Sequence, residues 1–230
     1  IREHKNMYAK REKELKQQIE NISHDLRTPL TSMLGYLRIM ETGNLSPEDR
    51  EDLQTVIRKA ERLQELITQF YEYTKVTSTD YSLSLENIEV TKLLREAMAD
   101  AYSELEKRQL EVEVNIPQGP LEIRGNVNAM QRVLQNLLQN AVRYAKGCLE
   151  VSAYEREGEV EICFANDVED MNVSDVERLF ERFYTPDVSR TQGSTGLGLT
   201  IAREFVEKMK GSMEAELVGE KLRIVMRFVR

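Results

Sequence analysis

The chain has 230 residues, of which 40% are apolar and 31% are charged, a composition that suits a globular protein with a charge-rich helical part. Its formal net charge is −8, and the acidic excess lies almost entirely after residue 80. No basic stripe is present to neutralise phosphates, so we do not expect nucleic acid as a partner. No apolar run approaches the roughly 18 residues of a membrane span. The two cysteines, Cys148 and Cys163, are too few for a disulfide framework and are expected to be reduced.

Residues 1–41 are predicted to form one long helix. Apolar residues recur in it at steps of three and four and form a coiled-coil-like stripe: Leu15, Ile19, Ile22, Leu26, Met33, Leu37 and Met40. His24, one of only two histidines, follows Ile22 by two residues. Its side chain is therefore expected to point away from the stripe into solvent.

A helix stop and a second helix follow. Gly43 suits a helix end, Ser46 a helix cap and Pro47 the first helical position, while Asp49 completes a capping box. The second helix repeats the spacing of three and four with Leu53, Val56, Ala60, Leu63, Ile67, Phe70 and Thr74. One hairpin has too little surface to bury such seams. We therefore predict that two hairpins pair into a four-helix bundle in a homodimer.

Residues 75–84 lose this spacing, gain Ser and Thr, and are predicted to be a linker. Alternating apolar and polar residues then predict strands near 110–116, 149–153, 160–164 and 222–228, with a turn at Gly219–Glu220 before the last one. Helical patterns at 91–108, 126–145 and 197–209 lie between the strands. This order favours an α+β sandwich with helices on one face of the sheet.

His24 and Asp25 are the first residues that could carry chemistry. An exposed imidazole is a competent nucleophile near neutral pH, and an adjacent carboxylate can orient the ring or take its proton. Thr28 stands one turn further along the same outward face. On spacing alone, an incidental surface histidine explains this pattern equally well.

The helix at 126–145 offers a second group. Asn136, Asn140 and Arg143 or Tyr144 line up along the flank of its apolar face. Amide oxygens can ligate Mg²⁺, and an Arg side chain can reach phosphate oxygens. Taken alone, ordinary polar flank residues would be the simpler interpretation.

A glycine-rich turn precedes the helix at 197–209. Gly196 and Gly198, two residues apart, let backbone N–H groups approach phosphates at a helix N-terminus. A glycine-rich cap without a ligand is an equal alternative. The preceding stretch from Tyr184 to Gln192 is polar and without period, as expected for a lid.

Together these segments resemble the sensor histidine kinases of two-component systems, and the resemblance covers nearly the whole chain. Residues 23–30 are similar to the phosphoacceptor box of that family, and residues 136–144 to its asparagine box. Residues 179–184 are similar to its phenylalanine box, and residues 195–199 to its second glycine box. The four motifs occur in the order of the family.

The resemblance implies a multidomain chain. Residues 1–14 would be a helical linker, and residues 15–80 an all-α hairpin that forms a dimeric four-helix bundle for dimerisation and histidine phosphotransfer. Residues 85–230 would be an α+β sandwich with the Bergerat (GHKL-type) ATP-binding fold. The implied protein is a homodimer that uses ATP and Mg²⁺ and has the receiver domain of a response regulator as its partner. It would be the cytoplasmic portion of a membrane-anchored sensor, with the membrane segment outside this chain.

The resemblance also implies roles. His24 would take the γ-phosphoryl group of ATP, Asp25 would be the general base, and Thr28 would position water when the regulator is dephosphorylated. Asn140 would ligate Mg²⁺, and the segment from Tyr184 to Ser194 would be the ATP lid. The implied ATP-binding residues are Asn136, Asn140, Arg143, Tyr144, Asn166, Arg182, Thr195, Gly196, Leu197, Gly198 and Leu199.

One motif departs from the family. Where the family has Asp-x-Gly-x-Gly, residues 166–170 read Asn-Asp-Val-Glu-Asp. Asn166 thus takes the place of the Asp that reads adenine, and we expect weaker nucleotide binding, because a charge-assisted hydrogen bond becomes a neutral one. Asp167 could substitute for it through a shift of register. We favour Asn166, and if it reads adenine, replacing it with Asp is expected to tighten ATP binding.

Three functions are weighed. The leading one is an autokinase that phosphorylates His24 and passes the group to an aspartate of a response regulator. The second has the same fold but acts mainly as a regulator phosphatase through the region of Thr28. The third is a nucleotide-blind scaffold. A relative of the gyrase or chaperone ATPases fits less well, because those proteins lack a helical bundle that carries a histidine.

Overall fold

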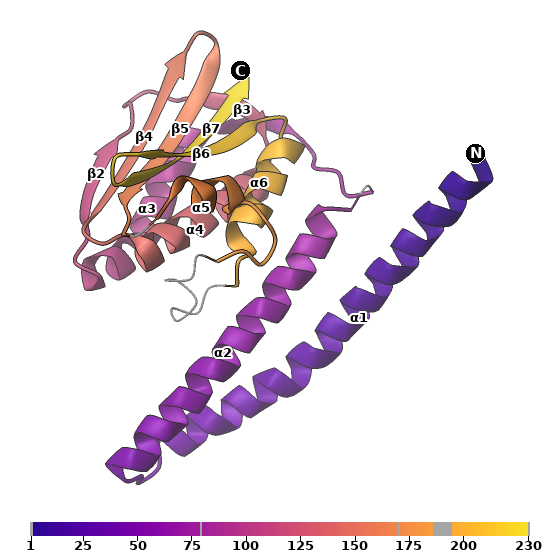
Figure 1. The fold of residues 1–230 in the computed structure, drawn as a ribbon, viewed down its shortest axis with the longest axis vertical. Helices are drawn as coiled ribbons and strands as arrows, with labels where there is room; N and C mark the ends of the chain where they lie inside the picture. Colours follow the sequence, from indigo (N-terminus) through magenta and orange to yellow (C-terminus); the bar gives the residue numbers. More distant parts are fainter. Residues whose placement is uncertain (1, 79, 170, 186–194, 230) are drawn as a thin grey trace. The chain divides into compact units, whose positions relative to one another are not determined.

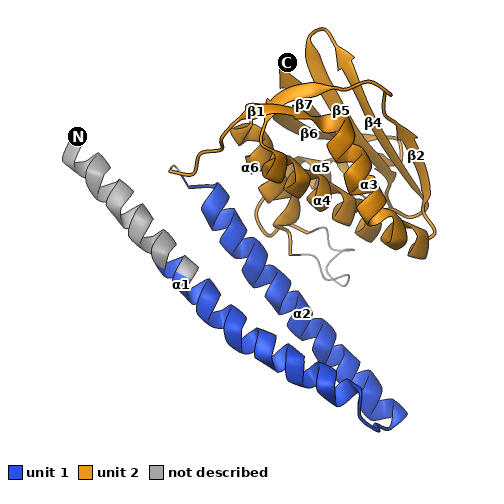
Figure 2. Cartoon of the chain, turned by 180° about the vertical axis from the view of Figure 1, so that it is seen from behind, with its two compact units in different colours: residues 1–78 blue, residues 79–230 orange. Residues whose placement is uncertain are grey.

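The computed structural model describes residues 2–78, 80–169, 171–185 and 195–229, with side chains from Gln18 onward except that of Glu20. The chain divides into two compact units, residues 1–78 and residues 79–230 (Figure 2). Unit 1 is a helical hairpin, and unit 2 combines helices with a β-sheet. This order of an all-α part followed by an α+β part is the predicted one.

Unit 1 consists of α1 (Arg2–Glu41) and α2 (Pro47–Val76), which run antiparallel (Figure 1). The predicted N-cap is confirmed, since the hydroxyl oxygen of Ser46 accepts a hydrogen bond from the backbone N–H of Asp49 at 3.1 Å. The reciprocal bond of a capping box is not formed among the described residues, because the Asp49 carboxylate accepts from the Ser46 hydroxyl at 2.6 Å instead. The last two residues of α2, Lys75 and Val76, were expected in the linker and instead continue the helix. In the part of the chain that the structure describes, no helix is both long enough and apolar enough to cross a membrane.

The two helices of unit 1 pack through a small apolar core. Leu34, Leu53 and Ile57 are buried in it. Much of the predicted seam is not part of this core. Its side chains remain about half exposed on both helices: Ile22, Leu26, Met33 and Met40 on α1, and Val56 and Leu63 on α2. Each helix therefore carries two apolar faces. One face closes the hairpin, and the other stays exposed in the single chain.

Unit 2 contains a five-stranded sheet and a separate strand pair. The sheet has the order β2 (Glu111–Asn115), β4 (Cys148–Arg156), β5 (Glu159–Asp167), β7 (Lys221–Val229) and β6 (Ser212–Val218). Its β2–β4 pair is parallel, and the other pairs are antiparallel. The second pair joins β1 (Glu86–Glu89) and β3 (Glu122–Gly125), which the sequence pattern did not predict.

Helices cover one face of the sheet (Figure 1). They are α3 (Val90–Lys107), α4 (Val127–Tyr144) and α6 (Gly198–Lys208), close to the predicted ranges, together with the short α5 (Val173–Arg178), which was not predicted. The alternating strand residues that face these helices, such as Ile162 and Met226, are fully buried. This face forms the core of unit 2.

The other face of the sheet carries charged side chains that form ion pairs. Arg227 pairs with Glu161 at 2.9 Å and with Glu214 at 2.7 Å. These pairs lie on the face that also carries a small buried cluster of Cys163, Ala165 and Val225. Both cysteines are free thiols, and burial raises the pKa of Cys163.

Asp167, at the end of β5, holds the turn between α4 and β4. Its Oδ1 accepts hydrogen bonds from the backbone N–H groups of Lys146 at 2.9 Å and Cys148 at 3.1 Å. Burial of the carboxyl opposes its ionisation, but the N–H groups of Cys148, Gly147 and Lys146 outweigh burial and hold the pKa of Asp167 below its ordinary value. Asp167 is therefore a structural residue of this turn.

Replacing Asp167 with Asn should destabilise unit 2 by about 1 kcal/mol at neutral pH, because an amide accepts more weakly than a carboxylate from the same donors. A carboxyl whose pKa is lowered by folding stabilises the protein above its unfolded-state pKa and loses that effect as pH falls through the folded-state value. The difference from the parent chain should thus shrink below about pH 4. Urea denaturation followed by circular dichroism at several pH values measures it.

The matched control for this experiment is Glu169→Gln. Glu169 is an exposed carboxylate that forms an ion pair with the side chain of Lys146 among the described residues. Its loss should change stability little at any pH. A destabilisation by Asp167→Asn that stays constant down to about pH 3 would contradict the proposed role of the carboxylate charge.

Candidate functional site

His24 lies on α1 with its side chain 78% exposed, beside Asp25, which is 82% exposed. The Nδ1 atom of the imidazole is 3.6 Å from Oδ1 of Asp25, which is too long for a hydrogen bond but within ion-pair range. The ring nitrogen that faces the carboxylate is therefore Nδ1. The other nitrogen, Nε2, is left open to a reaction partner.

The residues around His24 divide between the two sides of α1. Ser23 is only 4% exposed, although it directly precedes the exposed His24. Thr28 lies on the exposed side one turn after His24, and its hydroxyl donates to the carbonyl of His24 at 3.3 Å. The structure thus brings His24, Asp25 and Thr28 together on one solvent-facing patch, as the sequence predicted.

In unit 2, Asn136 lies at the contact between α4 and α6. It is 3% exposed, and its Nδ2 has no hydrogen-bond partner among the described residues. A Cβ atom placed on Gly198, the first residue of α6, would lie 3.3 Å from the Oδ1 of Asn136. Any side chain at position 198 would therefore crowd this amide. The asparagine and glycine motifs meet at this point, although about sixty residues separate them in the chain.

Asn140 lies one turn after Asn136 on α4 and is only partly buried. Arg143 and Tyr144 follow in the last turn of the helix and are partly buried as well. The helix end is fixed by Arg108, whose guanidinium donates to the carbonyls of Val142 at 3.0 Å and Arg143 at 3.3 Å. These three predicted site residues thus lie on one flank of a firmly anchored helix.

Asn166 and Asp167 end β5 and face opposite sides of the sheet. Asn166 is 4% exposed and points to the helical face, where its Nδ2 donates to the carbonyl of Asp167 at 2.9 Å. This bond uses Nδ2 and not Oδ1, and an amide oxygen can accept a hydrogen bond. Asp167 faces the other side and serves the α4–β4 turn, so a register shift would not bring it to the helical face. An aspartate at position 166 would lose the bond that Nδ2 makes, which opposes the gain expected from its charge.

The glycine motif combines backbone and packing roles. Gly196 has a φ of +68°, which favours glycine. The side chains of Leu197 and Leu199 are buried, so only their backbone could meet a ligand. The hydroxyl of Thr195 accepts from the N–H of Leu197 at 3.4 Å. Residues 186–194, most of the predicted lid, lie outside the described residues.

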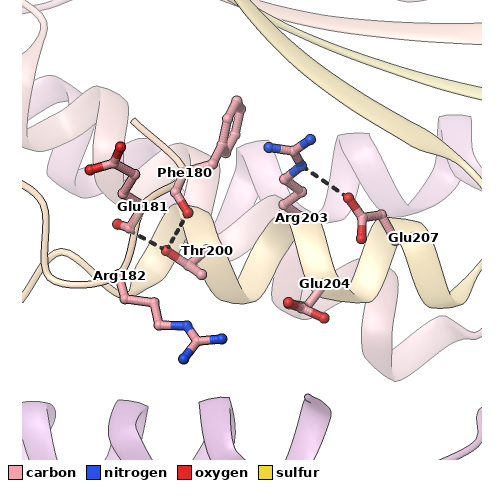
Figure 3. A pocket seen from close by; sticks show the side chains of 7 residues that line it. All are labelled: Phe180, Glu181, Arg182, Thr200, Arg203, Glu204 and Glu207. Atoms are coloured by element: carbon pink, nitrogen blue, oxygen red, sulfur yellow. Dashed lines mark hydrogen bonds and ion pairs between the residues drawn. The ribbon is translucent and has the colours of Figure 1, made fainter. Parts of the chain in front are cut away.

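Arg182 lines an open pocket formed by the phenylalanine motif and one face of α6 (Figure 3). The lining residues are Phe180, Glu181, Arg182, Thr200, Arg203, Glu204 and Glu207. Burial and the neighbouring Glu207 raise the pKa of Glu204. Three carboxylates against two guanidinium groups make a poor site for a triphosphate. This pocket shares Arg182 with the predicted ATP-binding residues but contains neither Asn136 nor Asn140.

Sequence reasoning missed the short helix α5. Its N-cap, Asn172, and the third helical residue, Asp175, form a reciprocal capping box with two bonds of 3.0 Å. The Asn-x-x-Asp spacing was visible in the sequence and is a known helix start. Without an apolar period behind it, six residues gave no other helical signal.

Two family profiles match the chain. Residues 14–79 match the "His Kinase A (phospho-acceptor) domain", and residues 125–229 match the "Histidine kinase-, DNA gyrase B-, and HSP90-like ATPase". Unit 1 is thus a phosphoacceptor domain, and unit 2 contains an ATPase domain of the predicted fold.

Curated relatives extend over nearly the whole chain. The sensor histidine kinase YcbM of Bacillus subtilis is 32% identical over 216 residues, which cover 91% of this chain and 69% of YcbM. WalK of the same organism is 30% identical, covering 92% of this chain and 36% of WalK. CpxA of Escherichia coli is 32% identical, covering 86% of this chain and 43% of CpxA. The chain spans less than half the length of WalK and CpxA.

Solved structures share the fold. Full-length ShkA, in a crystal structure with AMPPNP, aligns with a TM-score of 0.75 at 22% identity over 92% of this chain and 45% of the ShkA chain. The histidine kinase AdeS of Acinetobacter baumannii aligns with a TM-score of 0.64 at 20% identity over 90% of this chain and 97% of its own. With both domains matched in this order, and with YcbM similar along most of its length, the chain belongs to the sensor histidine kinases of two-component systems.

Proposed function

We propose that His24 accepts the γ-phosphoryl group of ATP and passes it to an aspartate of a response-regulator receiver domain. The observation that carries this proposal is the exposed imidazole of His24, whose Nδ1 faces Asp25 at 3.6 Å. A histidine used for packing would be buried. This one is solvent-facing on the helix of a phosphoacceptor domain.

The chemistry follows from the orientation of the ring. The lone pair of Nε2 attacks the γ-phosphorus, and the bond from the γ-phosphorus to the bridging oxygen breaks, so that ADP leaves with that electron pair. The proton on Nδ1 passes to Asp25, which acts as the general base. The phosphoryl group on Nε2 then moves to the carboxylate of the regulator, and the imidazole is restored.

The described residues of unit 2 fit ATP and Mg²⁺. The buried Nδ2 of Asn136 lacks a partner and suits a ligand acceptor, and the amide oxygen of Asn140 is a ligand type that Mg²⁺ accepts. Mg²⁺ held there would neutralise charge on the phosphate oxygens. Arg143 would contribute a guanidinium donor to phosphate. The backbone N–H groups at the start of α6, next to Gly198, would supply further donors.

Asn166 is proposed to read the adenine base. Its Nδ2 is held by the carbonyl of Asp167 at 2.9 Å, so its Oδ1 would accept from the adenine amino group. A neutral acceptor binds this group less strongly than a carboxylate. The proposal favours adenine over guanine, because guanine has an acceptor oxygen at the corresponding position.

The exposed apolar faces of unit 1 support the proposed homodimer. The faces include Ile22 and Leu26 on α1 and Val56 and Leu63 on α2, each about half exposed. Several exposed apolar side chains on both helices favour a binding surface over scattered single residues. Pairing of two hairpins would bury them.

Regulator dephosphorylation is a second activity favoured by one observation. Thr28 is exposed one turn from His24, and its hydroxyl oxygen can still accept a hydrogen bond. A water molecule held there would be next to a phosphoryl group on a docked regulator. Replacing Thr28 would be expected to slow dephosphorylation more than autophosphorylation.

The first test of the kinase uses γ-labelled ATP with Mg²⁺. The chain should acquire acid-labile, alkali-stable label, and His24→Gln should abolish it because the variant lacks the imidazole that stands beside the carboxylate of Asp25. The matched control is His4→Gln, which replaces the other histidine and should keep the label. Label that persists in His24→Gln would exclude His24 as the acceptor.

The second prediction concerns the base. Asn166→Ala should weaken ATP binding about tenfold, since one buried hydrogen bond is lost. Asp167→Asn should leave affinity within about twofold, because its carboxylate serves a turn on the other sheet face. Isothermal titration calorimetry of both variants measures this. The reverse ranking of the two variants would show that Asp167 reads the base.

The third prediction concerns assembly. Leu63→Glu introduces charge into the exposed apolar face of α2 and should shift the chain from dimer to monomer in sedimentation velocity, because a buried unpaired carboxylate is costly. Arg58→Glu, on the exposed opposite side of α2, is the control and should remain dimeric. A Leu63→Glu chain that sediments as a dimer would rule out this face as the interface.

A further inference from the structure

Two backbone segments that flank the predicted lid are joined at Phe183 and Gly196. The N–H of Phe183 donates to the carbonyl of Gly196 at 3.0 Å. A Cβ atom on Gly196 would lie 2.6 Å from the carbonyl carbon of Phe183 and 2.7 Å from the carbonyl oxygen of Tyr184. The two backbones therefore touch without room for a side chain. The position of Gly196 therefore depends on the position of the backbone at residues 183 and 184.

This junction requires support from its surroundings. Phe183 has a φ of +59°, in the left-handed region that is unfavourable for a residue with a side chain. Its own side chain is 55% exposed, so core packing does not hold it in place. Such a conformation persists only where neighbouring contacts determine it.

The neighbouring contacts come from α5 through Tyr184. The hydroxyl of Tyr184 donates to Oδ1 of Asp175 at 2.5 Å. The guanidinium carbon of Arg178 lies 4.2 Å from the centre of the Tyr184 ring. Asp175 and Arg178 are one turn apart on α5, so both hold the same aromatic side chain.

The two α5 residues are themselves fixed. The second carboxylate oxygen of Asp175 accepts from the N–H of Asn172 at 3.0 Å, within the capping box. Arg178 pairs with Glu181 at 3.0 Å. On the other side, the hydroxyl of Thr200 in α6 donates to the carbonyl of Phe180 at 3.1 Å. The segment from Phe180 to Tyr184 thus has contacts with both α5 and α6.

We propose that Tyr184, held by Asp175 and Arg178, is a positioning residue that sets the glycine motif for nucleotide binding. Through the junction with Gly196, it fixes backbone two residues before Gly198, where α6 begins against Asn136. The ligand class is the phosphate chain of a nucleoside triphosphate. This inference rests on the proposed function of unit 2 as the ATP site of the kinase.

The test uses Tyr184→Phe, which keeps the ring beneath Arg178 and removes the hydroxyl that donates to Asp175. The KM for ATP in autophosphorylation should rise about five- to tenfold, with kcat at saturating ATP nearly unchanged. Asp175→Asn should act in the same direction. The double variant should raise the KM no further than the larger of the two single effects, because Tyr184→Phe already removes the hydrogen bond that Asp175→Asn weakens.

Tyr154→Phe is the matched control. The hydroxyl of Tyr154 also donates to a carboxylate, that of Glu161, but on the charged outer face of the sheet. Its loss should leave the KM for ATP unchanged. Circular dichroism melting should give the same midpoint for the parent chain and Tyr184→Phe, which separates positioning from a general loss of stability.

The outcomes distinguish the inference from its premise. If the parent chain binds ATP and Tyr184→Phe leaves its KM unchanged, the positioning role is overturned and the proposed function stands. A fall in kcat with unchanged KM would also overturn it. If calorimetry finds no ATP binding by the parent chain, the proposed function fails, and the inference fails with it.

Discussion

The contact between α4 and α6 at Asn136 and Gly198 is the constraint on which the candidate nucleotide site depends. Glycine at position 198 allows the two helices to approach closely, since a Cβ there would lie 3.3 Å from Oδ1 of Asn136 and would press on this amide. Buried apolar residues on both helices, such as Leu134 and Ile201, hold the pair against the sheet. The asparagine and glycine motifs therefore depend on each other for their positions. Neither would form a site on an isolated helix.

Much of the fold could be predicted from the sequence, wherever a regular apolar spacing or a helix cap was present. The alternating pattern at Ile162 and Phe164 predicted β5, and the N-cap at Ser46 followed by Pro47 predicted the start of α2. The four motifs identified the family. Four-residue strands such as β1 and β3 were missed, because four residues are too few to establish a period.

Features that depend on tertiary contacts could not be predicted from the sequence. The apolar spacing on α1 predicted a seam but not its partner, and residues such as Ile22 proved to lie on the exposed face while Leu34 packs on α2. In a helix with two apolar faces, the apolar spacings of both faces overlap in the sequence, so the two faces cannot be told apart. In the same way, the contact of Tyr184 with Asp175 joins residues whose spacing has no regular period, so only the fold reveals it.

The end of β5 has a consequence for how this chain can vary. Asn166 and Asp167 are neighbours in sequence, yet one faces the candidate ligand side and the other holds a turn on the opposite side. The side chain on the candidate ligand side and the side chain that holds the turn therefore occupy separate positions, one residue apart. A lineage could change the side chain at position 166 and keep the carboxylate that holds the turn. The departure of this motif from the family pattern is then compatible with an intact domain.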